Sequence, residues 1–174
     1  SEPLGRGLIA TVAGDMHDIG KNLVRLMLEG KGFEIEDMGV DVPAEAVVEY
    51  IQNNPDCKLI CLSALLTTTL PALEDTVKAI KDAGLHEGRL IFIGGAPVTQ
   101  ELCDKIGADY YTDDAGSCAA KAAEVIATVA YPASTNPSQR RGRHFGVLFA
   151  YGAFLVKNAL STRQVRMLCT KSCT

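Results

Sequence analysis

The fold is decided by residues 7–20, which read Gly7-Leu8-Ile9-Ala10-Thr11-Val12-Ala13-Gly14-Asp15-Met16-His17-Asp18-Ile19-Gly20. The first half, Gly7–Ala13, is a short apolar run that predicts a strand buried on both faces. The second half is polar and rich in glycine, which predicts a loop, and residues 21–31 continue as an amphipathic helix. The stretch therefore predicts a strand, a loop and a helix, the first unit of an α/β fold.

The same alternation of apolar runs and amphipathic stretches continues to residue 131. Further strands are predicted at residues 33–38, 59–62, 90–93 and 109–111, and further helices from Pro43 and at residues 70–83, 98–106 and 116–129. Strands that alternate with helices imply right-handed crossovers and a parallel sheet covered on both faces. Five such units fit a doubly wound, flavodoxin-like (Rossmann-like) α/β fold with strand order 2-1-3-4-5.

Ligands of such sheets bind beyond the carboxyl ends of the strands, near the point where the strand order reverses. The loops expected there are residues 14–20, 63–69 and 94–99, which are rich in polar residues and glycine. In the first loop, the neutral imidazole of His17 is a good ligand for a transition metal, and Asp15 is near enough to hold its other ring nitrogen. Alternatively, Asp15 caps the following helix and His17 is an exposed loop residue.

The other two loops carry hydroxyl groups and glycines. Ser63 is expected to hydrogen-bond either a carboxylate of the neighbouring loop or nearby backbone. The run Thr67-Thr68-Thr69 either lines a polar pocket or caps the next helix, for which Thr69 has a suitable position. Gly94-Gly95-Ala96 is either a tight turn or a gap that admits a bulky group between the strand ends and the helices.

Taken together, the three loops carry a spaced motif. It consists of Asp15-x-His17-x-x-Gly20, Ser63-x-Leu65 and Gly94-Gly95, separated by 42 and 28 residues. Over residues 7–130 the chain resembles the cobalamin-binding domain family, which carries these elements in this order. The continuation Gly20-Lys21-Asn22 resembles the methyltransferase branch of that family. The run Ser63–Thr69 is similar to the small corrinoid proteins that serve methanol, methylamine and methoxy-aromatic demethylation.

The resemblance implies a cobalamin or related corrinoid as cofactor, with His17 as the lower axial ligand of its cobalt. It also implies that the corrinoid releases its own lower base and inserts its nucleotide tail into the domain. The residues expected to contact the cofactor are Asp15, Met16, His17, Asp18, Ile19, Gly20, Ser63, Leu65, Thr67, Thr68, Gly94, Gly95, Ala96, Asp113, Ala115 and Gly116. Tyr110 stands where relatives often have Gly, so we expect it to alter the pocket around the tail.

The same resemblance implies a methyl carrier that has no catalytic residues of its own. Such a protein accepts a methyl group from a substrate-specific methyltransferase and passes it to a second methyltransferase, which acts on tetrahydrofolate or a thiol. It also needs a reductive activator as a partner.

Three other classes of protein fit the sequence less well. An adenosylcobalamin mutase subunit tends to lack the Lys-Asn pair that follows Gly20 here. A cobalamin-dependent regulator or light sensor carries a DNA-binding or signalling module, which is not readable in this sequence. A receiver domain needs an aspartate where Ser63 stands, and a flavodoxin needs a phosphate-binding loop where residues 15–18 are acidic.

Charge divides the chain near residue 131. Residues 1–131 hold ten Lys or Arg and all twenty-one acidic residues, an excess of acid that excludes a nucleic-acid binder. Residues 132–174 hold seven Lys or Arg and no acid, after a turn-rich linker. We therefore expect a corrinoid-binding domain at residues 1–131 and a basic C-terminal extension at residues 132–174. The extension is either without function, a partner contact or a membrane-surface contact.

The six cysteines include no Cys-x-x-Cys pair and no zinc-site spacing. We expect Cys57 and Cys61 to be buried free thiols, kept reduced in a cytoplasm. The sequence contains neither an apolar run of about 18 residues nor a secretory signal, so we expect no membrane span and a cytoplasmic protein.

Overall fold

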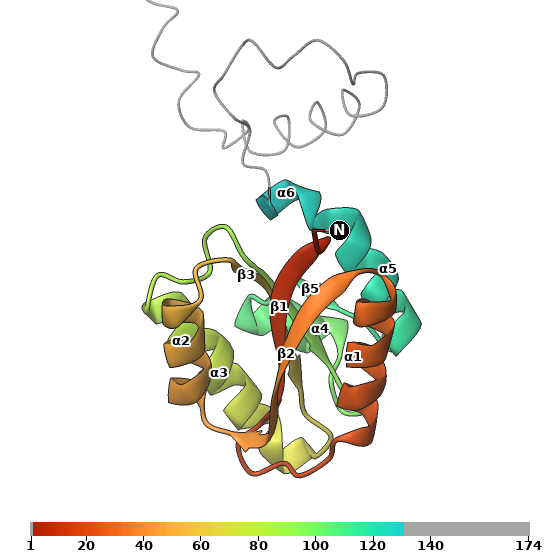
Figure 1. The fold of residues 1–174 in the computed structure, drawn as a ribbon. Helices are drawn as coiled ribbons and strands as arrows, with labels where there is room; N and C mark the ends of the chain where they lie inside the picture. The colour runs from red at the N-terminus through yellow and green to blue at the C-terminus, as the bar shows by residue number, and fades with distance from the viewer. Residues whose placement is uncertain (1, 131–174) are drawn as a thin grey trace, which may run out of the picture. The chain divides into compact units, whose positions relative to one another are not determined.

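The computed structural model describes residues 2–130, which form one parallel sheet covered by helices on both faces (Figure 1). The predicted extension at residues 132–174 lies outside the described residues. The sheet has five strands in the order β2-β1-β3-β4-β5, which confirms the predicted fold and strand order. The strands are β1 (Gly5–Val12), β2 (Phe33–Val42), β3 (Cys57–Ser63), β4 (Leu90–Gly94) and β5 (Tyr110–Tyr111).

The helices divide between the two faces of the sheet. They are α1 (Ile19–Gly30), α2 (Ala44–Asn53), the 3-10 turn η1 (Thr67–Thr69), α3 (Leu70–Asp82), α4 (Gln100–Ile106), α5 (Ala115–Val125) and α6 (Ala127–Ala130). One buried cluster joins the strands to α2, α3 and α4, and a second joins them to α1 and α5. Figure 1 shows α2 and α3 on the opposite side of the sheet from α1 and α5. The three central strands, β1, β3 and β4, bury both of their faces, which is why they read as continuous apolar runs. The first half of the edge strand β2 alternates instead between buried and exposed residues.

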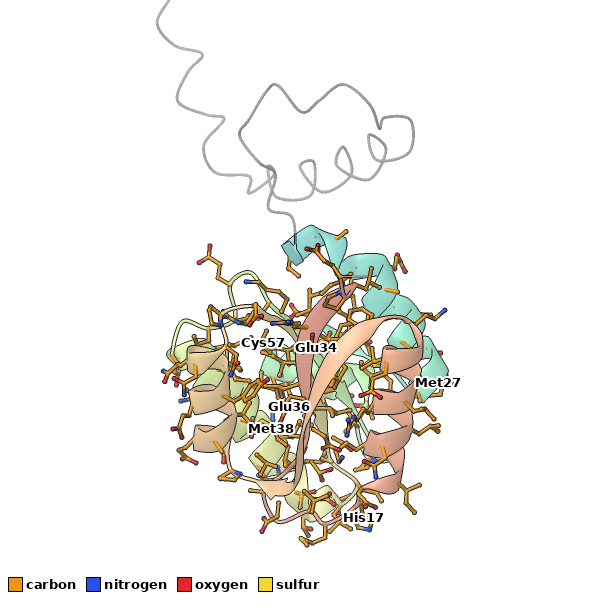
Figure 2. All side chains as sticks on the ribbon, viewed as in Figure 1. His17, Met27, Glu34, Glu36, Met38 and Cys57 are labelled. Atoms are coloured by element: carbon orange, nitrogen blue, oxygen red, sulfur yellow. The ribbon has the colours of Figure 1, made fainter. Side chains whose placement is uncertain are left out.

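The carboxyl ends of the three central strands lie in register. Thr11 of β1 pairs with Ser63 of β3, and Ser63 pairs with Gly94 of β4. The strand order reverses between β1 and β3, so the loops that follow these two strands lie next to each other. His17 lies at this edge in Figure 2, whereas Cys57 and Glu34 mark the opposite end of the sheet.

Two elements differ from the sequence prediction in ways that affect this edge. Strand β2 runs four residues beyond the predicted end at Met38. It continues although Gly39 and Asp41 both have positive φ, at 90° and 51°. The turn η1 was not predicted, and it precedes α3 directly. Both differences bring side chains toward the loop that contains His17.

Among residues 2–130, no helix is long and apolar enough to cross a bilayer.

Candidate functional site

The loop after β1 is organised around the carboxylate of Asp15, which is completely buried. Its Oδ1 accepts the His17 backbone N–H at 3.1 Å and lies 2.6 Å from His17 Nδ1. Its Oδ2 accepts the Leu65 N–H at 2.7 Å, the Leu66 N–H at 3.2 Å and the Thr69 hydroxyl at 2.9 Å. One carboxylate therefore ties the loop after β1 to the loop after β3.

The hydrogen bonds keep this buried carboxylate ionised. Burial by itself raises the pKa of Asp15, because a low-dielectric environment disfavours the charge. Donors from Leu65, His17 and Thr69 outweigh burial, and the pKa of Asp15 falls far below its ordinary value. Asp15 is therefore a fixed anion that can accept a hydrogen bond from a protonated ring nitrogen of His17.

The third member of this network is Thr69. Of the two roles open to Ser63, the hydrogen bond to a carboxylate of the neighbouring loop is not formed among the described residues, because Asp15 accepts from Thr69 instead. Thr69 sits at the N-terminus of α3, yet its side chain makes no capping bond there. Its hydroxyl contacts Asp15 and the Leu66 carbonyl instead. The turn η1 carries Thr69 back toward the strand ends, which places its hydroxyl within reach of Asp15.

The geometry leaves one nitrogen of His17 free for a ligand. Its side chain is 49% exposed, and Nδ1 is occupied by Asp15, so Nε2 remains available. The buried Thr11 hydroxyl donates to the His17 carbonyl at 2.8 Å and fixes the backbone of the loop. Within residues 2–130, no three His, Cys, Asp or Glu side chains are arranged to hold a metal ion. His17 can therefore supply one nitrogen ligand to a metal whose other ligands come from elsewhere than the described His, Cys, Asp and Glu side chains.

The extended end of β2 supports the same loop from the other side. The Asp41 N–H donates to the Asp15 carbonyl at 2.9 Å, and Asp41 Oδ1 accepts the Gly14 N–H at 2.7 Å. The left-handed backbone at Asp41 is the kind of conformation that Asp tolerates better than most residues. The loop that contains His17 is thus held on two sides by neighbouring strands.

Helix α1 is tied to β2 by a buried lysine. Lys21 is 3% exposed, and its Nζ lies 2.7 Å from both carboxylate oxygens of Asp37 and from Asn22 Oδ1. Burial raises the pKa of Asp37, but hydrogen bonds from Lys21 and the Gly39 N–H lower it overall. The Lys-Asn pair after Gly20 thus fixes the start of α1 beside His17.

A cavity of about 620 Å³ opens next to His17, between the strand ends and helices α1 and α5. Nine of the residues predicted to contact a cofactor line it, namely His17, Gly20, Ser63, Leu65, Gly94, Gly95, Ala96, Asp113 and Ala115. Thr67, Thr68 and Gly116 lie outside its wall, and both threonines are exposed. The strand ends therefore bring nine of the predicted residues into the wall of one cavity, but the hydroxyl groups of Thr67 and Thr68 lie outside it.

The remaining predicted residues belong to the loop around His17 rather than to the cavity. Asp15 lies behind His17, and Asp18 is the residue that precedes α1. Met16 and Ile19 are 68% and 84% exposed. Single exposed apolar residues are ordinary, but a group of them at one edge marks a binding surface.

Gly95 is required by the packing of the backbone. Its φ is +130°, and a Cβ at this position would lie 1.8 Å from the Ala64 carbonyl oxygen. The Ala64 N–H donates to the Gly94 carbonyl at 3.1 Å, so the turn after β4 lies directly against the end of β3. Of the two readings of Gly94-Gly95-Ala96, the structure supports the tight turn, which also forms one wall of the cavity.

Comparison with known proteins identifies the family. Residues 5–122 match the family model described as "B12 binding domain". The chain belongs to the B12-binding domain family. The match confirms the resemblance expected from the spaced motif and the corrinoid class of cofactor.

Several curated relatives and solved structures share this B12-binding domain. Dimethylamine corrinoid protein 1 of Methanosarcina acetivorans is 48% identical over 128 residues, which cover 73% of this chain and 59% of that protein. The monomethylamine corrinoid protein of Methanosarcina barkeri superposes with a TM-score of 0.67 at 37% identity, covering 70% of this chain and 58% of that one. The methanol:cobalamin methyltransferase complex MtaBC of the same organism gives a TM-score of 0.67 at 30% identity, covering 72% and 47%. The chain therefore spans between 47% and 59% of the length of these relatives.

The residues of this B12-binding domain fit a corrinoid. The cavity has room for a large substituent beside His17, and Nε2 of His17 is available to bind a metal. Four partly or largely exposed apolar side chains lie near His17. They are Met16 in its own loop, Ile19 at the start of α1, and Leu65 and Leu66 in the loop held by Asp15. A large, flat and mostly apolar ligand would cover this surface.

Sequence reasoning missed several residues of the cavity wall, including Leu23 and Val24 of α1 and Cys61 and Cys118 near its inner end. Strand alternation could have found Cys61, because it lies on the same face of β3 as Ser63. Tyr110 does not line the cavity. Its ring packs against the ring of Phe92, with centroids 4.9 Å apart, and Phe92 lines the cavity.

Proposed function

We propose that this protein is a corrinoid-binding methyl carrier that passes a methyl group between two partner methyltransferases. The observation that carries the proposal is the pairing of His17 with a buried, ionised Asp15 beside a large cavity. The relatives support the carrier class, since they are named corrinoid proteins of methylamines. They favour it over a mutase subunit or a regulator.

Asp15 sets which nitrogen of His17 is available to the cofactor. An ionised carboxylate 2.6 Å from Nδ1 favours a proton on Nδ1 and leaves the lone pair on Nε2. The bound corrinoid supplies the methyl-carrying chemistry through its cobalt. His17 is the residue that would bind that metal, through Nε2, and so tune its chemistry.

Asp15 and Thr69 define how His17 would hold a metal. The metal would take the lone pair of Nε2, while Asp15 keeps Nδ1 as the nitrogen that carries the proton. The Thr69 hydroxyl and two backbone N–H groups hold Asp15 ionised, so its carboxylate stays an acceptor for the Nδ1 proton.

We assign the cavity to the nucleotide tail of the corrinoid. Ser63, Leu65 and the turn Gly94-Gly95-Ala96 form the wall nearest the strand ends, and Asp113 and Ala115 form part of the wall contributed by the loop before α5 and its first residue. Thr67 and Thr68, exposed outside the wall, are available to the edge of the macrocycle or to a partner.

The partners follow from the carrier role. MtaBC, at 30% identity, is named as a methanol:cobalamin methyltransferase complex. We propose a substrate-specific methyltransferase as donor, a second methyltransferase acting on tetrahydrofolate or a thiol as acceptor, and a reductive activator. We place the protein in the cytoplasm, where the buried free thiols stay reduced.

The proposal is tested by replacing the ligand. We expect wild-type protein, loaded with cobalamin, to show the visible bands of an imidazole-ligated cobalt. His17→Gly should retain the corrinoid through the cavity but lose those bands, and free imidazole should restore them.

His86→Gln is the matched control. His86 pairs with Asp109 at 2.8 Å, away from the cavity wall, so this variant should keep the wild-type spectrum. Unchanged axial bands in His17→Gly, or a wild-type protein that never retains corrinoid, would refute the proposal.

A further inference from the structure

The cavity changes in character from its mouth to its floor. At the mouth, His17, Leu65 and Asp113 are exposed. At the floor, Ile9, Cys61, Phe92 and Cys118 are each less than 5% exposed. A ligand that fills the cavity therefore places its inner end against apolar side chains and two thiols.

Two buried thiols lie at the floor of the cavity. Cys61 comes from β3 and Cys118 from α5, and both line the cavity. The neighbouring Cys118 and burial raise the pKa of Cys61, so it stays protonated. A thiol is a weak donor and a weak acceptor, which leaves the floor with little to offer a strongly polar ligand.

We propose that this floor makes the protein selective among corrinoids by their lower base, accepting benzimidazole and phenolic bases and discriminating against purines. The inference rests on the proposed function, in which the nucleotide tail occupies this cavity. Benzimidazole and phenolic bases present a carbon edge on the side away from the sugar. A purine presents ring nitrogens and, in adenine, an exocyclic amine.

The physical reason is the cost of unpaired polar groups. Each donor or acceptor that a purine buries at this floor loses its water and finds only weak partners, which reduces affinity about tenfold for each lost hydrogen bond. The carbon edge of a benzimidazole or phenolic base makes no hydrogen bonds to water, so its burial at the floor breaks none. It gains contact with the sulfur atoms of Cys61 and Cys118, which pack favourably against aromatic rings, and with the Phe92 ring.

The experiment is a spectrophotometric titration of the full chain, freed of corrinoid, with four ligands. These are cobalamin, a cresolyl cobamide, an adeninyl cobamide and cobinamide, which lacks the nucleotide. We expect cobalamin and the cresolyl compound to bind at least about tenfold more tightly than the adeninyl compound.

Variants of the floor connect the selectivity to the thiols. Cys118→Ser introduces a stronger hydrogen-bonding group and should narrow the ratio between cobalamin and the adeninyl compound, as should Cys61→Ser. Cys103→Ser is the matched control, because Cys103 is equally buried but lies on α4 outside the cavity wall, and its ratio should equal that of wild type.

The outcomes separate the two proposals. Equal affinity of wild type for all three cobamides overturns the base selectivity and leaves the proposed function intact. If cobalamin binds no more tightly than cobinamide, the nucleotide tail contributes no affinity. That result would overturn both the assignment of the cavity to the tail and the base selectivity. Failure of all four ligands to bind overturns the proposed function itself.

Discussion

Asp15 shows how much one side chain contributes to this site. It is completely buried, and five hydrogen-bonding contacts from four residues converge on its two oxygens. A buried charge is tolerable only when donors of this quality surround it. Asp15 is therefore both the partner of His17 and a structural bond between the loops after β1 and β3.

Replacing Asp15 by Asn should destabilise the protein. An amide cannot accept on both sides, so one group of donors faces an N–H₂ instead of a carboxylate. We expect the free energy of unfolding at pH 7 to fall by about 2 kcal/mol or more, measured by urea denaturation. Asp75→Asn, at an exposed position on α3, is the control and should change little.

Wild type and Asp15→Asn should also differ in how their stability changes at acidic pH. The pKa of Asp15 is lower in the folded state than the ordinary value of about 3.9 expected for the unfolded chain. Its contribution to stability is therefore fully present above roughly pH 4 and declines as the pH falls toward the folded pKa. We expect wild-type stability to drop more steeply below pH 4 than that of Asp15→Asn, and parallel pH profiles would contradict this account.

At the level of residues, the sequence predicted the pairing of Asp15 with His17 because two residues of one tight loop are always close. It did not identify Thr69 as the third member. That contact joins residues 54 positions apart and depends on the turn η1. A run of three threonines does not predict a 3-10 turn. Local propensity favours such hydroxyls as caps, and the buried carboxylate outweighs this preference.

Among the elements, all five strands and all the main helices were predictable from hydrophobic periodicity. The end of β2 was not, because Gly39 and Asp41 are poor strand residues. The strand continues since its backbone pairs with β1 as far as Val12 and supports Gly14 and Asp15. Tertiary contacts of this kind are not visible in a local pattern.

Two glycines of the motif should respond oppositely to the same substitution. Gly95→Ala drives a Cβ into the Ala64 carbonyl at a φ that Ala rarely adopts. We expect a loss of about 3 kcal/mol or more in unfolding free energy, together with loss of corrinoid retention. The clash involves two backbone segments, so no rotamer change relieves it.

Gly20→Ala is the matched substitution within α1. Nothing lies within 4 Å of a Cβ there, and Ala is the better helix former, so stability should hold or rise by about 0.5 kcal/mol. Gly20 nevertheless lines the cavity beside His17, and we expect weaker corrinoid binding in a titration. A destabilised Gly20→Ala, or a Gly95→Ala as stable as wild type, would contradict these assignments.

For the whole molecule, residues 2–130 contain both faces of the core, the sheet and every residue assigned to the site. We expect a protein of residues 1–131 to fold with a Tm within about 2 °C of the full chain and to give the same corrinoid spectrum. Calorimetry and visible spectroscopy measure both. A truncated protein that unfolds or loses the corrinoid would show that residues 132–174 belong to the domain.

The single free nitrogen of His17 has a consequence for how the protein obtains its metal. Ionic cobalt in water finds one imidazole here, and no group of three His, Cys, Asp or Glu within residues 2–130 that could hold it. Lone imidazoles compete poorly with sites of three or four ligands. Residues 2–130 therefore offer free cobalt no site of that kind, and we expect this domain to receive the metal inside its organic ring, so that the choice of metal is made where that ring is built.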